Sequence, residues 1–212
     1  KQGDATYQLM SQTNIFPINN SLTINGGTID ANTQTTIQIG RDFNNAAGVF
    51  LPKNSTVQFI PTVAGTYSIV AGATSSFNNV RFDAPAGTIY NINTNDVTVS
   101  GNLNINGGEL RLNGRNLNFG DGVGTDGISI SGVNSKMSIN TNASLKLGNN
   151  SSVVVSSNGQ ISIIGTDDLN RATLTRSGAT GSYSFTVNDG KIFARWYKFE
   201  YMNASGIQIN SN

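Results

Sequence analysis

Short apolar pairs, each separated by one polar residue, recur through the second half of the chain, and their spacing constrains the fold. An alternation of period two is typical of a strand, because successive side chains of a strand point to opposite sides. Strands this short are unstable as isolated hairpins, so each needs a neighbour on both sides. Four of the pairs begin at a regular step of eight residues: Met137/Ile139, Leu145/Leu147, Val153/Val155 and Ile161/Ile163.

Three such strands with their corners use about two dozen residues. This length is typical of one turn of a solenoid that has three strands, one on each of three faces. The prediction is an all-β fold, a right-handed single-stranded parallel β-helix (β-solenoid). At roughly 22 residues per coil and ~4.8 Å between coils, we expect about nine coils and a rod on the order of 45 Å long. A β-sandwich is the alternative, since it too consists of many short strands and turns.

A short phrase occurs twice in the chain, at 21–29 and at 102–110. Both copies are an apolar strand, an Asn-Gly-Gly turn and a second strand, and self-similarity of this kind is typical of repeat architectures. Asparagine followed by glycine favours the positive φ angles of tight turns. In a solenoid, asparagines at equivalent corners can also bond to each other's amides from coil to coil.

Composition excludes several classes of function. The 212 residues carry a net charge of +1, which disfavours nucleic-acid binding, and no apolar run is long enough for membrane insertion. The chain has no histidine and no cysteine, which excludes Ser-His-Asp and Cys-His catalysis, histidine metal sites and disulfides.

Four phrases within residues 49–120 carry a resemblance to a known family: Ser55–Phe59 (STVQF), Ser76–Phe82 (SFNNVRF), Val97–Ile105 (VTVSGNLNI) and Gly108–Gly114 (GELRLNG). With them, this part of the chain resembles the large, secreted, β-helical repeat proteins of bacterial cell surfaces. The aromatic segment 190–202 is similar to a module that such proteins often carry. The resemblance implies a secreted, adhesin-like protein displayed on the bacterial cell surface, and it transfers no catalytic residues.

We divide the chain into three parts. Residues 1–20 are expected to be an N-terminal cap or a strand donated to a neighbour, 21–182 the solenoid coils, and 183–212 aromatic-rich final coils that continue in a longer protein. A stack of parallel strands ends in unpaired backbone groups, so an end without a cap can pair with another chain. We therefore expect self-association through the solenoid ends, giving a filament.

Two acidic pairs are the candidates for chemistry at carboxylates. Asp121 and Asp126 lie in a glycine-rich loop, and Asp167 and Asp168 are adjacent. Asp121 and Asp126 could hold Ca²⁺, which prefers oxygen ligands in flexible loops, although the usual calcium-loop spacing is not met. Aspartate beside glycine is ordinarily a turn residue. We therefore expect no catalytic residues and no required cofactor.

Seven of the seventeen aromatic residues fall between 183 and 201. Alternation along this segment places Phe193, Arg195, Tyr197, Phe199 and Tyr201 on one face, and Ile192, Ala194 and Trp196 on the other. Exposed rings could stack on sugars, which makes Arg195, Trp196, Tyr197, Phe199 and Tyr201 the candidate carbohydrate-binding residues. The alternative is that the rings fill or cover the core.

The sequence thus favours a non-catalytic structural or adhesive surface module, whose partners are further copies of itself or surface glycans. A carbohydrate-binding module and a carbohydrate-active β-helix enzyme are the alternatives.

Overall fold

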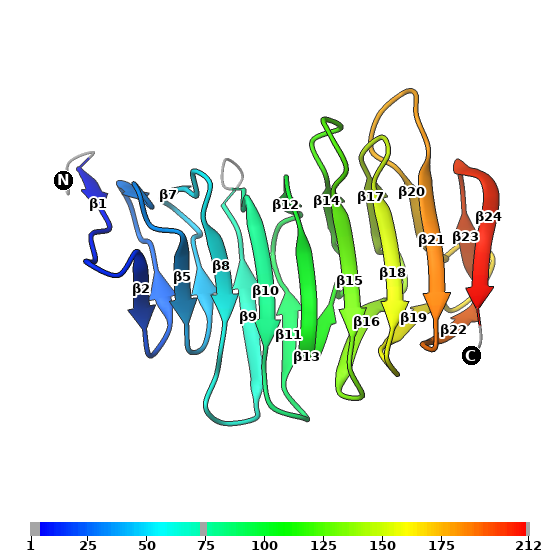
Figure 1. The fold of residues 1–212 in the computed structure, drawn as a ribbon, viewed down its shortest axis with the longest axis horizontal. Helices are drawn as coiled ribbons and strands as arrows, with labels where there is room; N and C mark the ends of the chain where they lie inside the picture. The colour runs from blue at the N-terminus through cyan, green and yellow to red at the C-terminus, as the bar shows by residue number, and fades with distance from the viewer. Residues whose placement is uncertain (1–4, 73–75, 211–212) are drawn as a thin grey trace.

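The protein is a β-solenoid, in which the chain winds along one axis from its N-terminus to its C-terminus (Figure 1). The computed structural model describes residues 5–72 and 76–210, and within these ranges it contains strands and no helix. Strands pair in parallel with the equivalent strands of the coils before and after, as β15 (Gly127–Ser131) does with β13 (Leu103–Arg111) and β18 (Ser152–Ser156). The predicted fold class is confirmed, because a β-sandwich is built from antiparallel pairs.

The strands form three faces, which we call face one, face two and face three. Face one consists of β2 (Ile15–Ile18), β5 (Thr36–Ile39), β8 (Thr56–Phe59), β10 (Asn79–Asp83), the first part of β13, β15, β18, β21 (Tyr183–Asn188) and β24 (Met202–Asn210). Face two consists of β3 (Leu22–Thr23), β6 (Phe43–Asn44), β9 (Thr66–Val70), β11 (Ile89–Ile92), the second part of β13, β16 (Ser135–Ile139), β19 (Gln160–Ile164) and β22 (Lys191–Arg195).

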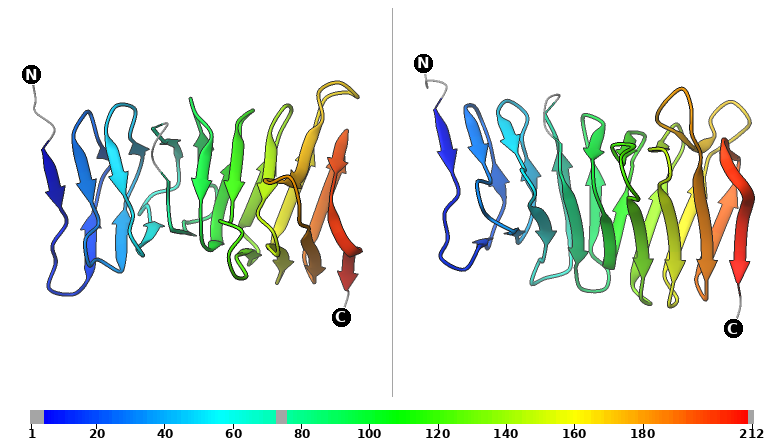
Figure 2. Two further views of the ribbon diagram at one scale, coloured as in Figure 1. Left: turned by 90° about the horizontal axis from the view of Figure 1, so that it is seen from above. Right: turned by 45° about the horizontal axis from the view of Figure 1, so that its top comes forward.

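Face three has two segments. Figure 2 shows the stack of coils from two further directions. The N-terminal segment consists of β1 (Thr6–Gln8), β4 (Thr28–Asp30) and β7 (Val49–Leu51). The second segment consists of β12 (Val97–Val99), β14 (Asn116–Phe119), β17 (Ser144–Leu147), β20 (Ala172–Arg176) and β23 (Tyr197–Phe199). Phe77 lies between the two segments, since it forms a parallel bridge with Val99 while its ring lies 6.1 Å from that of Phe50.

The step of eight residues corresponds to one face of the coil. Met137 lies on face two, Leu145 on face three and Val153 on face one, and Ile161 returns to face two in register with Met137. The solenoid has about eight turns, against about nine expected. Coils range from 20 residues, between Thr36 and Thr56, to 32 residues, between Val153 and Phe185. Loops at the corners lengthen the later coils, so fewer turns fit in the chain.

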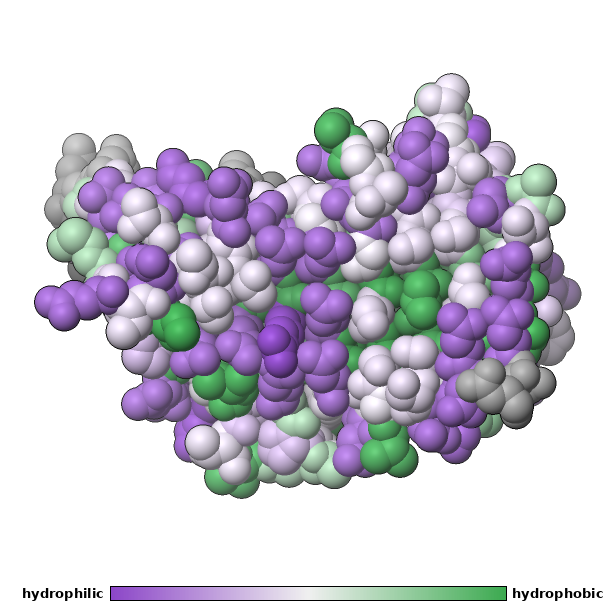
Figure 3. All heavy atoms as spheres, viewed as in Figure 1, coloured by the Kyte–Doolittle hydropathy of each residue, from purple (hydrophilic) through white to green (hydrophobic). Residues whose placement is uncertain are grey.

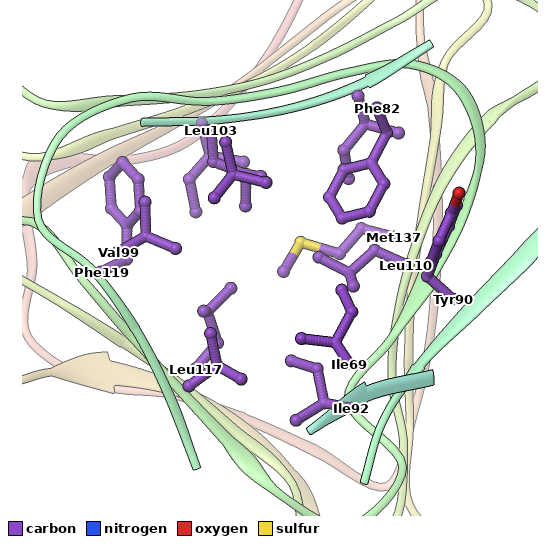
Figure 4. Packing of buried hydrophobic residues seen from close by; sticks show 14 of the residues in the cluster. Ile69, Phe82, Tyr90, Ile92, Val99, Leu103, Leu110, Leu117, Phe119 and Met137 are labelled. Carbon is purple, nitrogen blue, oxygen red and sulfur yellow. The ribbon is translucent and has the colours of Figure 1, made fainter. Parts of the chain in front are cut away.

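Inward side chains of the three faces fill a continuous apolar core, shown in the close view of Figure 4. The apolar pairs that define the strand pattern from Val97 to Ile163 all lie there, each residue at most 3% exposed. Aromatic rings contribute to the core at the coils around Phe59 and Phe82, whose rings stack at 4.9 Å with Tyr90 beside them.

The duplicated phrase forms two different corners. Its first copy turns between face two and face three, from β3 to β4, whereas its second copy turns between face one and face two within β13. In both copies the positive φ falls on the second glycine, Gly27 at 70° and Gly108 at 79°. The phrase therefore specifies a corner between two short strands, not a fixed place in the coil.

Polar side chains bond from coil to coil on the outside, as expected for asparagine. Asn113 donates to Asn93 at 2.9 Å, and Asn210 donates to Asn188 at 2.7 Å. On face one, which Figure 3 shows from outside, Gln58 accepts from Gln38 at 3.1 Å. These bonds satisfy polar groups along the stack and hold the register of neighbouring coils.

The segments at the two ends of the chain contribute strands to the stack. Within 1–20, β1 pairs with β4 and β2 pairs with β5, so the described residues there belong to the first coil. Within 183–212, β21, β22, β23 and β24 continue the three faces.

Candidate functional site

The aromatic segment near the C-terminus is divided between two faces of the last coil. β22 ends at Arg195, and β23 begins at Tyr197 on face three. Trp196 lies between them with a φ of 49°, in the left-handed region that turns the chain. Tyr201 has a φ of 59° and lies between β23 and β24. The expectation of one continuous strand with a single aromatic face is therefore wrong.

The two sides of β22 differ in chemistry. Ile192 and Ala194 are in register with the buried Ile161 and Ile163 of the preceding coil, so they face the core. The alternate residues Lys191, Phe193 and Arg195 therefore point outward. Phe193 is 49% exposed. Of the predicted sugar-binding residues, only Arg195 lies on this outer surface of β22.

The two aromatic residues of β23 occupy core positions. Tyr197 and Phe199 are in register with the buried Ala172 and Leu174. The Phe199 ring packs edge-on against Phe185, with centroids 5.5 Å apart, and at the same distance from Tyr197. Tyr197 is nevertheless 48% exposed, because in the described part of the chain no further coil lies over it.

Trp196 and Tyr201 lie at corners of the last coil, and Tyr201 already has a partner. The guanidinium of Arg176 lies over the Tyr201 ring, 3.9 Å from its centroid, which is a cation–π contact. The five predicted carbohydrate-binding residues thus divide among an outer face, two corners and the core-facing side, and the structure does not bring them onto one surface.

The C-terminal end of the solenoid exposes core-type side chains. In β24, Ile207 and Ile209 are in register with the buried Phe185 and Val187, yet they are 37% and 67% exposed. Their alternation is visible in the sequence, but their exposure depends on β24 being the last described strand of face one. Together with Tyr197 and Phe199 they form what we call the terminal apolar surface.

The N-terminal end of the solenoid also exposes side chains at core positions. Tyr7 is in register with Ile29, and Phe16 and Ile18 are in register with the buried Ile37 and Ile39. Tyr7 is 63% exposed, and Phe16 and Ile18 are half-buried. Both described ends of the stack therefore present apolar side chains beside strand edges.

Asp121 and Asp126 lie in one loop and bond to it. The carboxylate of Asp126 accepts from the Asp121 amide at 3.2 Å, and that of Asp121 accepts from the Val123 amide at 2.7 Å. Burial, together with the charge of Asp121, raises the pKa of Asp126. No group of three or more acidic residues suited to a metal ion occurs within residues 5–72 and 76–210. The Ca²⁺ expectation stays a prediction, and these bonds are those of turn aspartates.

The second acidic pair is also engaged locally. Asp167 accepts from the amides of Leu169 and Asn170, both at 2.9 Å, and Asp168 pairs with Arg171 at 2.7 Å.

One carboxylate on face two links three side chains and was not singled out in the sequence. Glu109 accepts from Arg111 at 2.9 Å and from the Ser138 hydroxyl at 2.5 Å, and it lies 3.4 Å from the Lys136 ammonium. Burial raises the pKa of Glu109, but these hydrogen bonds and charges outweigh burial, so that the pKa lies below its usual range. Arg111 and Lys136 thus share one counter-charge.

Comparison with known proteins gives no relative, since no family model, no curated protein and no solved structure matches the chain. None of the described residues forms a helix with the length and apolarity that a membrane crossing needs.

Proposed function

We propose that the chain is a non-catalytic structural module of a secreted protein of the bacterial cell surface, and that its solenoid ends stack on those of further copies. The observation that carries this proposal is the terminal apolar surface, where residues at core positions stand exposed beside strand edges that no further described strand covers. The secreted location is supported by the sequence resemblance. The absence of catalysis is supported by the two acidic pairs, whose carboxylates bond within their own loops.

An open end exposes apolar side chains and unpaired backbone groups, and stacking of one coil on another would remove both. Burial of the apolar area would contribute a free energy of about 25 cal/mol per Å². The backbone groups of the edge strands would form hydrogen bonds across the junction. The three faces of the C-terminal coil end in β24, β22 and β23, and the first coil presents β2, β3 and β1 on the same three faces. Joining the C-terminal end to the N-terminal end of a second copy preserves the parallel pairing on each face.

Charge favours this head-to-tail arrangement over a symmetric one. In the C-terminal coil Lys198 pairs with Glu200, whereas Lys191 and Arg195 form no ion pair with a described residue. Joining two C-terminal ends would bring these two cations near their own copies. The first coil, residues 5–24, contains no charged residue. A heterologous contact of this kind does not close on itself and gives an open filament.

A substitution on the terminal apolar surface tests the proposal. Ile209→Lys places a charge where the next coil would stack, and we expect at least about a tenfold weaker association, because an unpaired ammonium is costly to bury. Sedimentation velocity over a range of concentrations measures this effect.

Gln208→Lys is the matched control, since it adds the same charge to the neighbouring outward position of β24. We expect this variant to associate like the unaltered chain. A chain that stays monomeric at every concentration, or equal effects of the two substitutions, would contradict the proposal.

A further inference from the structure

The outer side of face two carries a compact group of side chains on its last two strands. Lys191, Phe193 and Arg195 of β22 are in register with Gln160, Ser162 and Ile164 of β19. Since neighbouring strands lie about 4.8 Å apart, these six side chains form a patch two strands wide and three residues long. We call it the β19/β22 patch; its two strands adjoin at the C-terminal end of the solenoid (Figure 1).

No described carboxylate lies within ion-pairing distance of the two cations of this patch. Within residues 5–72 and 76–210, neither Lys191 nor Arg195 takes part in an ion pair, and both are exposed. The contrast with neighbouring cations is clear, since Lys136 shares Glu109 and Lys198 pairs with Glu200 at 2.7 Å. The patch therefore has two unpaired positive charges available to an anionic ligand.

An aromatic ring lies between these charges. Phe193 is 49% exposed on a flat sheet face, where an outward residue of a soluble domain is usually polar. Its register partner Ser162 is small and only 8% exposed, so no bulky side chain stands beside the ring on that strand. Along the strand, each cation is about 6.6 Å from the ring position, so that the three side chains span about 13 Å.

We propose that the β19/β22 patch binds an acidic polysaccharide. The flat Phe193 ring would stack on one sugar ring, and Lys191 and Arg195 would pair with carboxylates on either side of it. Gln160, which is partly exposed, offers hydrogen bonds to hydroxyls. A surface hollow of about 240 Å³ begins at Gln160 and Lys136 and extends the patch toward the preceding coils.

The composition of the patch favours an acidic glycan over nucleic acid or a membrane. Nucleic-acid binding depends on neutralising many phosphates, and two free cations on a chain of net charge +1 supply little of this. In an acidic polysaccharide, sugar rings with an apolar face carry separate carboxylates. A single aromatic ring between two cations matches this arrangement. The proposal concerns a side face, so it is independent of stacking at the solenoid ends.

The test uses polygalacturonate as the acidic probe and its fully methyl-esterified form as the neutral one, with binding measured by isothermal titration calorimetry. We expect the acidic polymer to bind, with affinity that falls as salt rises, and the ester to bind at least about tenfold more weakly. Lys191→Gln and Phe193→Ser copy the residues one coil below, so these substitutions leave the fold intact, and each is expected to weaken binding about five- to tenfold.

Lys146→Gln on the outer side of face three is the control, and it should leave binding unchanged. Equal binding of the ester, equal binding of duplex DNA of matched charge, or equal loss in the Lys146→Gln control would each overturn the proposal. The same titration of the Ile209→Lys variant separates the two proposals, because we expect unchanged glycan binding from a chain that no longer stacks end to end.

Discussion

Replacing Phe119 by alanine lowers the free energy of unfolding by about 3–5 kcal/mol in our account, the cost typical of deleting a fully buried aromatic ring. Phe119 is fully buried on face three, in register with Val99 below and Leu147 above. Stacked coils on both sides limit collapse into the cavity, because each inward residue is held by its own strand pairing. Urea denaturation followed by circular dichroism measures the change.

Asn118→Ala is the control for this substitution, since Asn118 is the neighbouring outward residue of β14. We expect its effect on the free energy of unfolding to stay within about 0.5 kcal/mol. A comparable loss from Asn118→Ala, or a Phe119→Ala variant as stable as the unaltered chain, would show that the inward and outward sides of face three are assigned wrongly.

Gly107→Ala is expected to have the second largest effect. A Cβ atom at Gly107 would collide with the carbonyl oxygen of Ala84, which belongs to the backbone of the preceding coil. Backbone cannot rotate aside as a flexible side chain can, so the coils must separate at this corner. We expect a loss of about 1–3 kcal/mol in the free energy of unfolding, the cost typical of overpacking.

The duplicated phrase provides a matched control. Gly26 occupies the same place in the first copy as Gly107 does in the second, but a Cβ there meets no atom within 4 Å. Gly26→Ala should therefore change the free energy of unfolding by no more than about 0.5 kcal/mol. Equal effects at the two glycines would contradict the placement of the two copies at different corners.

The fold was predictable because its signal is local and repeated. Each apolar pair defines one strand, and the step of eight from Met137 to Ile161 defines three faces per coil. Parallel stacking follows, since strands as short as these apolar pairs gain stability only from neighbours of the same kind. The number of turns was less predictable, because corner loops such as those between Val155 and Tyr183 vary in length.

The arrangement of the aromatic segment could not be predicted from alternation alone. Alternation continues only while the chain stays extended, and Trp196 gives no sign in its residue type of the positive φ that ends β22. Tryptophan rarely adopts that conformation, so a corner there is unexpected. Because Trp196 forms the corner between β22 and β23, Tyr197 and Phe199 lie on the core side of face three. Phe193 and Arg195 lie on the outer side of face two.

The terminal apolar surface shows a different limit of sequence reasoning. Ile207 and Ile209 have the pattern of ordinary core residues, and only the position of β24 in the stack makes them exposed. The sequence identifies which side chains face inward, whereas the three-dimensional stack determines which of them have no further described coil above them.

The most direct measurement of our central proposal is electron cryomicroscopy of the chain at high concentration. We expect filaments in which solenoids join end to end, with a continuous strand repeat of about 4.8 Å along the filament axis across each junction. Single short rods at every concentration, or particles joined through their sides with exposed ends, would contradict the proposal that the terminal apolar surface is the site of assembly.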